Sequence, residues 1–88
     1  MIMNRIERIK KILNQKFKPT HLILLDNSSN HKGHNNFDGS DMTHLQLEIS
    51  SNYFKNLKLV DIHREINFSI QQEFKEGLHA FEIKVVAN

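Results

Sequence analysis

Histidine is the residue type in this chain best suited to chemistry. The 88-residue sequence contains six histidines and no cysteine. Imidazole is the commonest neutral metal ligand, and it is the side chain that changes charge near neutral pH. Because the chain has no thiol, any metal or cluster that it binds must be held by imidazole, by carboxylate or by ligands from another molecule.

Three of the histidines lie close together in the sequence. His31 and His34 are separated by Lys32 and Gly33, and His44 opens a segment of alternating apolar residues. The spacing of His31 and His34 allows both to ligate one metal ion, and the alternative is a pair of solvated loop histidines. His44 falls on the polar side of its segment, which indicates a surface or cross-strand contact.

Two further histidines belong to predicted elements. His79 lies just after Gly77 and alternates in phase with Phe81 and Ile83. It therefore falls at the end of an apolar strand face, where the imidazole either emerges at the rim or is a partly buried structural side chain. His63 lies one residue from the apolar stripe of a predicted helix and is interpreted as a packing residue.

No motif in the sequence predicts catalysis. There is no Gly-x-Gly-x-x-Gly or Walker-type phosphate loop, no His-Glu-x-x-His zinc motif and no Gly-x-Ser-x-Gly nucleophile motif. The histidines also lack a carboxylate in the arrangement of a catalytic triad. We therefore expect that the protein is not an enzyme.

Length and composition predict one small soluble domain over residues 1–88. The chain is 39% hydrophobic and 25% charged, as is usual for globular proteins. The first residues mix charged and apolar side chains, which is unlike a signal peptide, and no apolar run reaches the roughly 20 residues of a membrane span. The lack of cysteine fits a reducing compartment. These features predict a cytoplasmic protein that does not associate with membranes.

Positive charge is concentrated at the start of the chain. Residues 1–20 carry six basic side chains and one acidic side chain, whereas the net charge of the whole chain is +2. The helix predicted there includes Arg5, Arg8 and Lys11, which would contact phosphates or an acidic partner. The alternative is a solvated helix face.

The apolar periodicity predicts three elements in the first half of the chain. A stripe at helical spacing from Ile2 to Phe17 predicts a helix over about residues 3–17, which the following proline ends. Residues 21–25 form a short apolar run and predict a strand. A polar loop over residues 26–41 follows, and its length is typical of functional or disordered loops.

The second half of the chain predicts two more strands and another long helix. Residues 44–50 alternate strictly and predict a half-buried strand that pairs with the first strand in an antiparallel hairpin. Ser51 and Asn52 can cap a short helical turn that runs through Tyr53, Phe54 and Leu57. Apolar residues at helical spacing then predict a long helix over about residues 59–75, and residues 79–85 alternate as a third strand. The apolar stripe of this helix comprises Leu59, Ile62, Ile66, Ile70 and Phe74. The predicted fold is α+β in the order α-β-β-α-α-β, a three-stranded mixed sheet with helices on one face.

Four segments of the chain resemble the BolA family. Residues 26–34 read DNSSNHKGH, where the family commonly has DES-x-x-H-x-G-H, and residues 40–45 read SDMTHL, similar to its GSETHF. Residues 60–64 read VDIHR, similar to its RHR segment, and residues 77–83 read GLHAFEI, similar to its G-x-HAL-x-I signature. The chain departs from the family at Ile62, which replaces the first arginine of RHR.

The resemblance implies both a fold and a function. The family has the α-β-β-α-α-β order and is related to the type II KH fold. BolA-like proteins form heterodimers with monothiol glutaredoxins and take part in [2Fe–2S] cluster assembly, trafficking or iron regulation. His79 matches a cluster ligand, and His34, with His31 as its substitute, matches a loop ligand; glutaredoxin and glutathione supply thiolates. His63 and Arg64 match residues that contact the partner. No cluster is expected to be tightly bound in the isolated protein.

A nucleic-acid-binding role is the alternative. Some family members are described as transcriptional regulators, and the KH relationship suggests contact with DNA, for which this chain offers Arg5, Arg8 and Lys11. A KH domain grips the nucleic-acid backbone with a Gly-x-x-Gly loop, and the three glycines of this chain are too far apart to form one. Strongly salt-dependent binding would distinguish this role from cluster binding.

Overall fold

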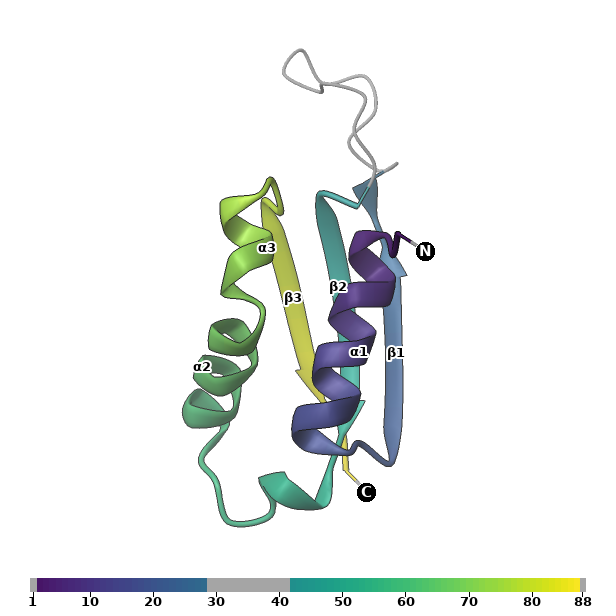
Figure 1. Ribbon diagram of the computed structural model, residues 1–88. Helices are drawn as coiled ribbons and strands as arrows, with labels where there is room; N and C mark the ends of the chain where they lie inside the picture. Colours follow the sequence, from purple (N-terminus) through teal and green to yellow (C-terminus); the bar gives the residue numbers. More distant parts are fainter. Residues whose placement is uncertain (1, 29–41, 88) are drawn as a thin grey trace.

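Three helices, three strands and one short 3-10 helix make up the structure, a computed structural model that describes residues 2–28 and 42–87 (Figure 1). The elements are α1 (Arg5–Phe17), β1 (His21–Asp26), β2 (His44–Ser50), η2 (Asn52–Phe54), α2 (Leu59–Ser69), α3 (Gln71–Lys75) and β3 (Ala80–Val85). The predicted α+β order is confirmed. Most of the predicted loop, residues 29–41 with His31 and His34, lies outside the described residues.

A capping box begins α1. The Asn4 side chain accepts a hydrogen bond from the Glu7 amide at 2.8 Å, and the Glu7 carboxylate accepts one from the Asn4 amide at 3.1 Å. These bonds satisfy amides that the first helical turn leaves without partners. The cap places the start of the helix at Arg5, so the predicted membership of Ile2 in the apolar stripe is wrong; Ile2 is 96% exposed.

The three strands form a mixed sheet with β2 in the centre. Strand β1 pairs with β2 antiparallel, and β3 pairs with β2 parallel, in a register that places His44 opposite Ala80. The predicted alternation of β2 is confirmed, because Leu45, Leu47 and Ile49 are all buried. A parallel pair requires a long crossover, which the helices between β2 and β3 provide.

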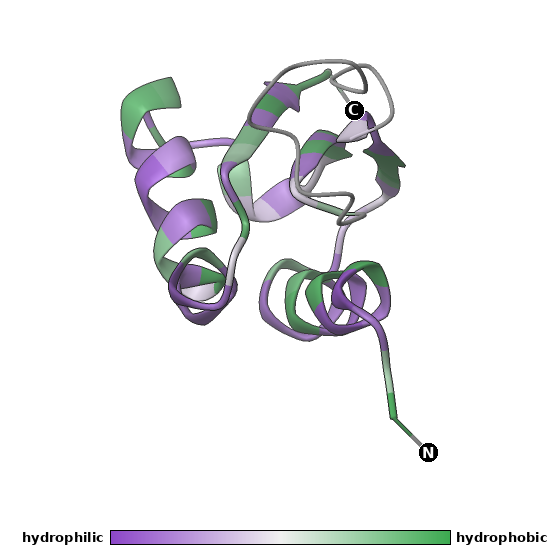
Figure 2. Ribbon diagram, turned by 90° about the horizontal axis from the view of Figure 1, so that it is seen from above, coloured by the Kyte–Doolittle hydropathy of each residue, from purple (hydrophilic) through white to green (hydrophobic). Residues whose placement is uncertain are grey.

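Helices cover one face of the sheet, as predicted. Figure 1 shows α1 in front of β1 and β2, with α2 and α3 beside it, and Figure 2 shows from above that the helices lie on the same side of the strands. The core between these layers consists of Ile9, Leu13, Phe17, Leu24, Leu45, Leu47, Ile49, Phe54, Ile62, Ile66, Ile70 and Leu78. The half-buried residues Phe81, Ile83 and Val85 pack against this core from β3.

The predicted long helix over residues 59–75 is two helices. Ile70 has φ −114° and ψ 19°, outside the helical region, and separates α2 from α3. Glu73 is buried, whereas Phe74 is 37% exposed and Leu59 is 59% exposed. The prediction that Leu59 and Phe74 belong to the buried apolar stripe is therefore wrong. Among the described residues, no helix is long and apolar enough to cross a membrane.

Candidate ligand site at the start of β2 and β3

His79 is exposed at the end of the sheet, immediately before β3. The chain reaches it from α3 through Gly77, whose φ of 118° is a left-handed conformation that favours glycine. The His79 amide donates to the Thr43 carbonyl at 2.8 Å, and the Ala80 amide donates to the same oxygen at 3.1 Å. Two bonds to one carbonyl thus fix the backbone of His79 while its imidazole faces solvent. The rim position expected for His79 is found.

His44 lies beside His79. The centroids of the two imidazole rings are 5.8 Å apart, and the rings meet edge to face at 71°. The parallel register brings them together, because His44 opens β2 opposite Ala80, the residue after His79. The hydroxyl oxygen of Thr43 lies 3.0 Å from Nδ1 of His44, which restrains the half-buried His44 ring.

Ser28 and Thr43 join the ends of β1 and β2 next to the two histidines. The Ser28 hydroxyl oxygen accepts from the Thr43 amide at 2.8 Å and from the His44 amide at 3.2 Å. The Asp26 carboxylate accepts from the amides of Ser28 at 2.9 Å and Met42 at 3.2 Å. Partial burial by itself raises the pKa of Asp26, but these bonds and the nearby His44 bring the pKa below its usual value. The backbone on which His44 is mounted is therefore closely held.

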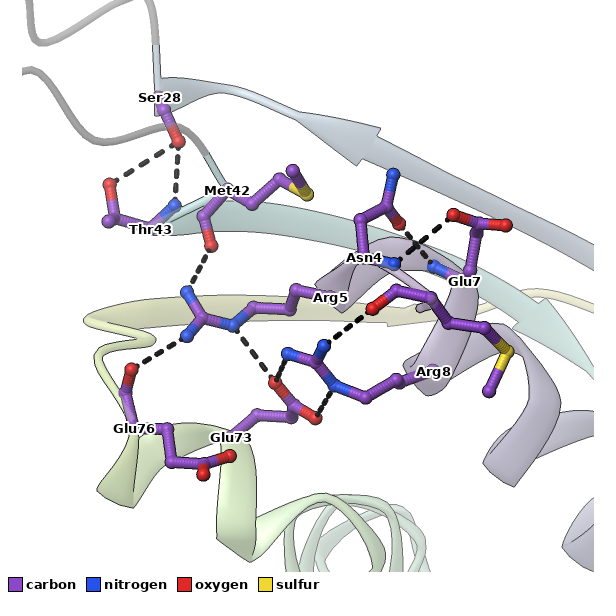
Figure 3. A network of polar contacts seen from close by, with 10 residues as sticks. Asn4, Arg5, Glu7, Arg8, Ser28, Met42, Thr43, Glu73 and Glu76 are labelled. Atoms are coloured by element: carbon purple, nitrogen blue, oxygen red, sulfur yellow. Dashed lines mark hydrogen bonds and ion pairs between the residues drawn. The ribbon is translucent and has the colours of Figure 1, made fainter. Parts of the chain in front are cut away.

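A second polar network joins α1 to α3 at the same end of the sheet (Figure 3). Arg5 and Arg8 both donate to the Glu73 carboxylate, at distances of 2.8–3.0 Å. The hydrogen bond from Arg8, assisted by the one from Arg5, holds the pKa of the Glu73 carboxyl below its usual value despite burial. The same bond raises the pKa of Arg8. Glu73 is thus an ionised carboxylate with two cationic partners, at the edge of the core.

The other residues predicted to be functional lie elsewhere or are already engaged. His63 and Arg64 belong to α2, which α3 separates from the start of β3 (Figure 1). His63 is half-buried, whereas the Arg64 side chain is 75% exposed. Nη1 of Arg64 lies 3.7 Å from Oδ1 of Asp61. Lys11 is exposed on α1. The two histidines of residues 29–41, His31 and His34, have no described position.

The nucleic-acid alternative receives little support from its proposed residues. The Arg5 and Arg8 side chains are 12% and 37% exposed, and each donates to Glu73 and to at least one backbone carbonyl oxygen. A phosphate would have to compete with these partners. Of the three residues in that hypothesis, Lys11 alone is exposed on the helix surface.

The described residues provide a pair of imidazoles and no complete metal centre. In residues 2–28 and 42–87, no three histidine, aspartate or glutamate side chains are grouped to hold a metal ion. A metal or cluster bound at His79 would therefore need ligands from another molecule or from the part of the chain that is not described.

The sequence pattern indicates this site only in part. It predicts a surface or cross-strand contact for His44, and the structure shows a cross-strand contact, but the identity of its neighbour, His79, depends on the parallel register of β2 and β3. The only signal was that each histidine stands at the start of a predicted strand. The role of Glu73 was also missed, and its signal was a carboxylate next to the apolar stripe of α3, in a chain whose first helix is rich in arginine and lysine.

The chain was compared with known proteins. The family model described as BolA-like protein matches residues 13–88. An uncharacterized protein of Sinorhizobium sp is 35% identical over 86 residues, covering 97% of this chain and 92% of that protein. The chloroplastic protein BOLA1 of Arabidopsis thaliana is 34% identical over 84 residues, covering 93% of this chain, and the chain spans about half (52%) of that protein's length.

Solved structures agree with the sequence matches. The BolA domain of SufE1 from Arabidopsis thaliana superposes with a TM-score of 0.84 at 34% identity, and BolA1 from the same plant with a TM-score of 0.85 at 32% identity. Each comparison covers 99% of this chain and 95% of the other. The fold, the family model and the relatives agree, and the chain belongs to the BolA family.

Proposed function

We propose that this protein is a non-enzymatic partner of a monothiol glutaredoxin and supplies imidazole ligands to a [2Fe–2S] cluster that the two proteins share. The main observation behind this proposal is the position of His79, whose backbone is fixed by hydrogen bonds while its imidazole is exposed at the rim of the sheet. His34 is the second proposed ligand, with His31 as its substitute. The glutaredoxin cysteine and the thiolate of glutathione complete the set of four.

The side chains of this protein suit such a shared cluster. A [2Fe–2S] centre has four protein or small-molecule ligands, and this chain has no cysteine to provide a thiolate. Replacing thiolates with neutral imidazoles lowers the negative charge of the ligand set and raises the reduction potential, as in Rieske centres. Because protonated imidazole cannot bind iron, imidazole ligation of a cluster weakens in acid.

The ligand hypothesis is tested by reconstitution with a partner. The protein is mixed with a monothiol glutaredoxin, glutathione, iron and sulfide, and the complex is followed by visible absorption and circular dichroism. We expect His79→Ala to abolish the signal of the mixed complex with little change in the urea midpoint of the free protein, because the side chain is exposed. His34→Ala is expected to weaken the signal less, because His31 would substitute.

His21→Ala is the matched control. It removes the same side-chain type from the start of β1, which pairs with the last residue of β2 and so lies at the opposite end of the sheet from His79, and it should leave the cluster signal unchanged. If His21→Ala destroyed the signal while His79→Ala preserved it, the ligand assignment would be wrong.

The same proposal predicts that the isolated protein is colourless. The proposal assigns it two of the four ligands that the cluster needs, so purification without a partner should give no stoichiometric iron and no charge-transfer absorption. Iron and sulfide analysis of the purified chain provides the measurement. A brown monomer with two iron atoms per chain would show that the protein holds the cluster by itself.

A further inference from the structure

We propose that Arg5 is a positioning residue for His79. Its guanidinium group donates hydrogen bonds to the backbone just before β2 and to the backbone just before β3, and these two segments together hold His79. This inference rests on the proposed function in one respect only, the assignment of His79 as a ligand. The hydrogen bonds from Arg5 to Met42, Glu73 and Glu76, called the brace below, are present in the free protein and are measured without a partner.

Arg5 reaches three acceptors from one nearly buried guanidinium group. Its Nε donates to Oε1 of Glu73 at 3.0 Å, its Nη1 to the Met42 carbonyl at 2.9 Å and its Nη2 to the Glu76 carbonyl at 2.8 Å (Figure 3). The side chain is only 12% exposed. Hydrogen bonds with a charged donor are about twice as strong as neutral ones, and burial limits competition from water.

The two carbonyls belong to the segments that lead into β2 and β3. Met42 has φ 60°, an uncommon conformation for a residue other than glycine, and it precedes Thr43. Glu76 precedes Gly77, the left-handed turn that leads to His79. Arg5 therefore spans both segments just before the strands begin, where regular sheet bonds do not yet hold them.

Thr43 closes the connection on the other side. Its carbonyl accepts from the amides of His79 and Ala80, and it follows directly after Met42, whose carbonyl Arg5 holds. The chain from Met42 to Thr43, the chain from Glu76 to His79, and Arg5 thus form a closed ring of covalent and hydrogen bonds. Fixing both ends of the short turn at Gly77 limits where the His79 ring lies relative to His44.

The chemistry of the brace requires arginine. Guanidinium is planar and carries five N–H donors in a rigid fork, so it serves three acceptors in different directions at once. A lysine at this position would keep the charge but concentrate its donors on one nitrogen. Arg5→Lys therefore removes the geometry of the brace while preserving the ion pair with Glu73.

Arg8 is a matched control within the same network. It donates two hydrogen bonds to Glu73, which join α1 to α3, and one to the carbonyl of Met3, which precedes α1. Within the part of the chain that the structure describes, Arg8 donates no hydrogen bond to Met42 or Glu76. Arg8→Lys therefore keeps a cation beside Glu73, as Arg5→Lys does, and leaves the connection to His79 intact.

The free protein provides the first measurement. Hydrogen exchange by NMR is recorded for the His79 and Ala80 amides in the parent, Arg5→Lys and Arg8→Lys, together with the imidazole shifts of His44 and His79. Arg5→Lys should accelerate exchange of the two amides about tenfold beyond its effect on core amides and move the imidazole shifts, as loss of about one charged hydrogen bond implies. Arg8→Lys should change only the exchange that follows global stability. Equal effects of both variants would show that Arg5 has a general structural role.

The mixed complex with a monothiol glutaredoxin, glutathione and iron provides the second measurement. Arg5→Lys should raise the dissociation constant of the cluster-bound complex about tenfold and alter its circular dichroism, whereas Arg8→Lys should do neither. If Arg5→Lys moved His79 in the free protein and left the complex unchanged, the positioning role would be overturned. If His79→Ala also left the complex unchanged, the fault would lie with the proposed function instead.

A second pair of variants is matched in charge. Combining Glu73→Gln with Arg5→Gln, or Glu73→Gln with Arg8→Gln, removes the carboxylate and one of its two arginines, so each double variant leaves a single arginine without its carboxylate. The pair containing Arg5→Gln should again be the one that accelerates exchange at His79. The same result for both pairs would overturn the proposal.

Discussion

Glu73 is the residue on which the polar contacts between α1 and α3 depend. Its side chain is 5% exposed and accepts from Arg5 and Arg8, which are 12% and 37% exposed. A buried ion pair adds little stability compared with an apolar replacement of both partners, but removing one partner leaves buried charge without compensation. Replacing Glu73 alone should therefore destabilise the fold more than its position on a five-residue helix suggests.

We expect Glu73→Ala to lower the free energy of unfolding by about 3–5 kcal/mol, because it leaves two arginines facing a vacated, largely dry position. Urea denaturation followed by circular dichroism measures the change. Glu76→Ala is the control, because Arg5 bonds only to the backbone carbonyl of Glu76; its effect should stay within about 0.5 kcal/mol. A loss of similar size in both variants would contradict this assignment.

The positions of single site residues could be predicted from the sequence more accurately than the residues that they contact. The phase of His79 with Phe81 placed it correctly at the end of an apolar face, since strand alternation depends only on the chain itself. For Arg5 the sequence left open a contact to phosphates, a contact to an acidic partner and a solvated helix face, because a local pattern records its charge but not the distant carboxylate that it meets, 68 residues away along the chain. Contacts of that separation depend on how the helices pack, which no local period contains.

At the scale of elements, the cap of α1 is linked to the site. Arg5 is the first residue of the helix, directly after the Asn4 cap. Fraying of the first turn would therefore release the residue that holds Met42 and Glu76. The capping box supports the site by keeping that turn helical.

Replacing the cap tests this link. Asn4→Ala should lower the free energy of unfolding by about 1 kcal/mol, the usual cost of losing an N-cap side chain. It should also increase hydrogen exchange in the first turn of α1. Asn14→Ala, an exposed position within the same helix, should be neutral or slightly stabilising, because alanine has the higher helix propensity. An Asn4→Ala variant as stable as Asn14→Ala would show that the capping box contributes nothing.

Strand elements could be predicted from the sequence more completely than helix ends. The bounds of β2 and its buried face agree with the alternation of residues 44–50. The division of the second helix at Ile70 was not predicted, because Ile70 is itself buried and fits the apolar stripe on either side of the break. After the break, α3 meets α1 through the hydrogen bonds of Glu73, a tertiary interaction that no local pattern records.

At the scale of the whole molecule, two carboxylates make stability depend on acid. The folded pKa values of Glu73 and Asp26 lie below their ordinary values of 4.5 and 3.8. Such groups stabilise the fold fully above the unfolded pKa, and this contribution is lost as the pH falls through the folded pKa. The unfolded chain then binds more protons than the folded one, so acid favours unfolding.

We therefore expect the urea midpoint to be unaffected by these two carboxylates between about pH 7 and pH 5.5, and to fall as the pH drops below about 4.5. Denaturation curves at fixed ionic strength across this range measure the effect. In Glu73→Gln the fall should be shallower, because the titrating group with two arginine partners has been removed. An unchanged slope in that variant would show that acid acts through other groups.

The parallel pairing of β2 and β3 also bears on the order in which the strands pair during folding. Gln46 and Glu82 bond across these strands although 36 residues separate them along the chain, whereas Asn27 and Gln46 bond across 19 residues. Longer loops cost more entropy to close, and distant pairings slow folding. The His44–His79 pair comes into existence only when the more distant of the two strand pairings has formed. A folding intermediate with β1 and β2 alone would carry His44 without its neighbour, so the two-histidine rim marks a completed fold.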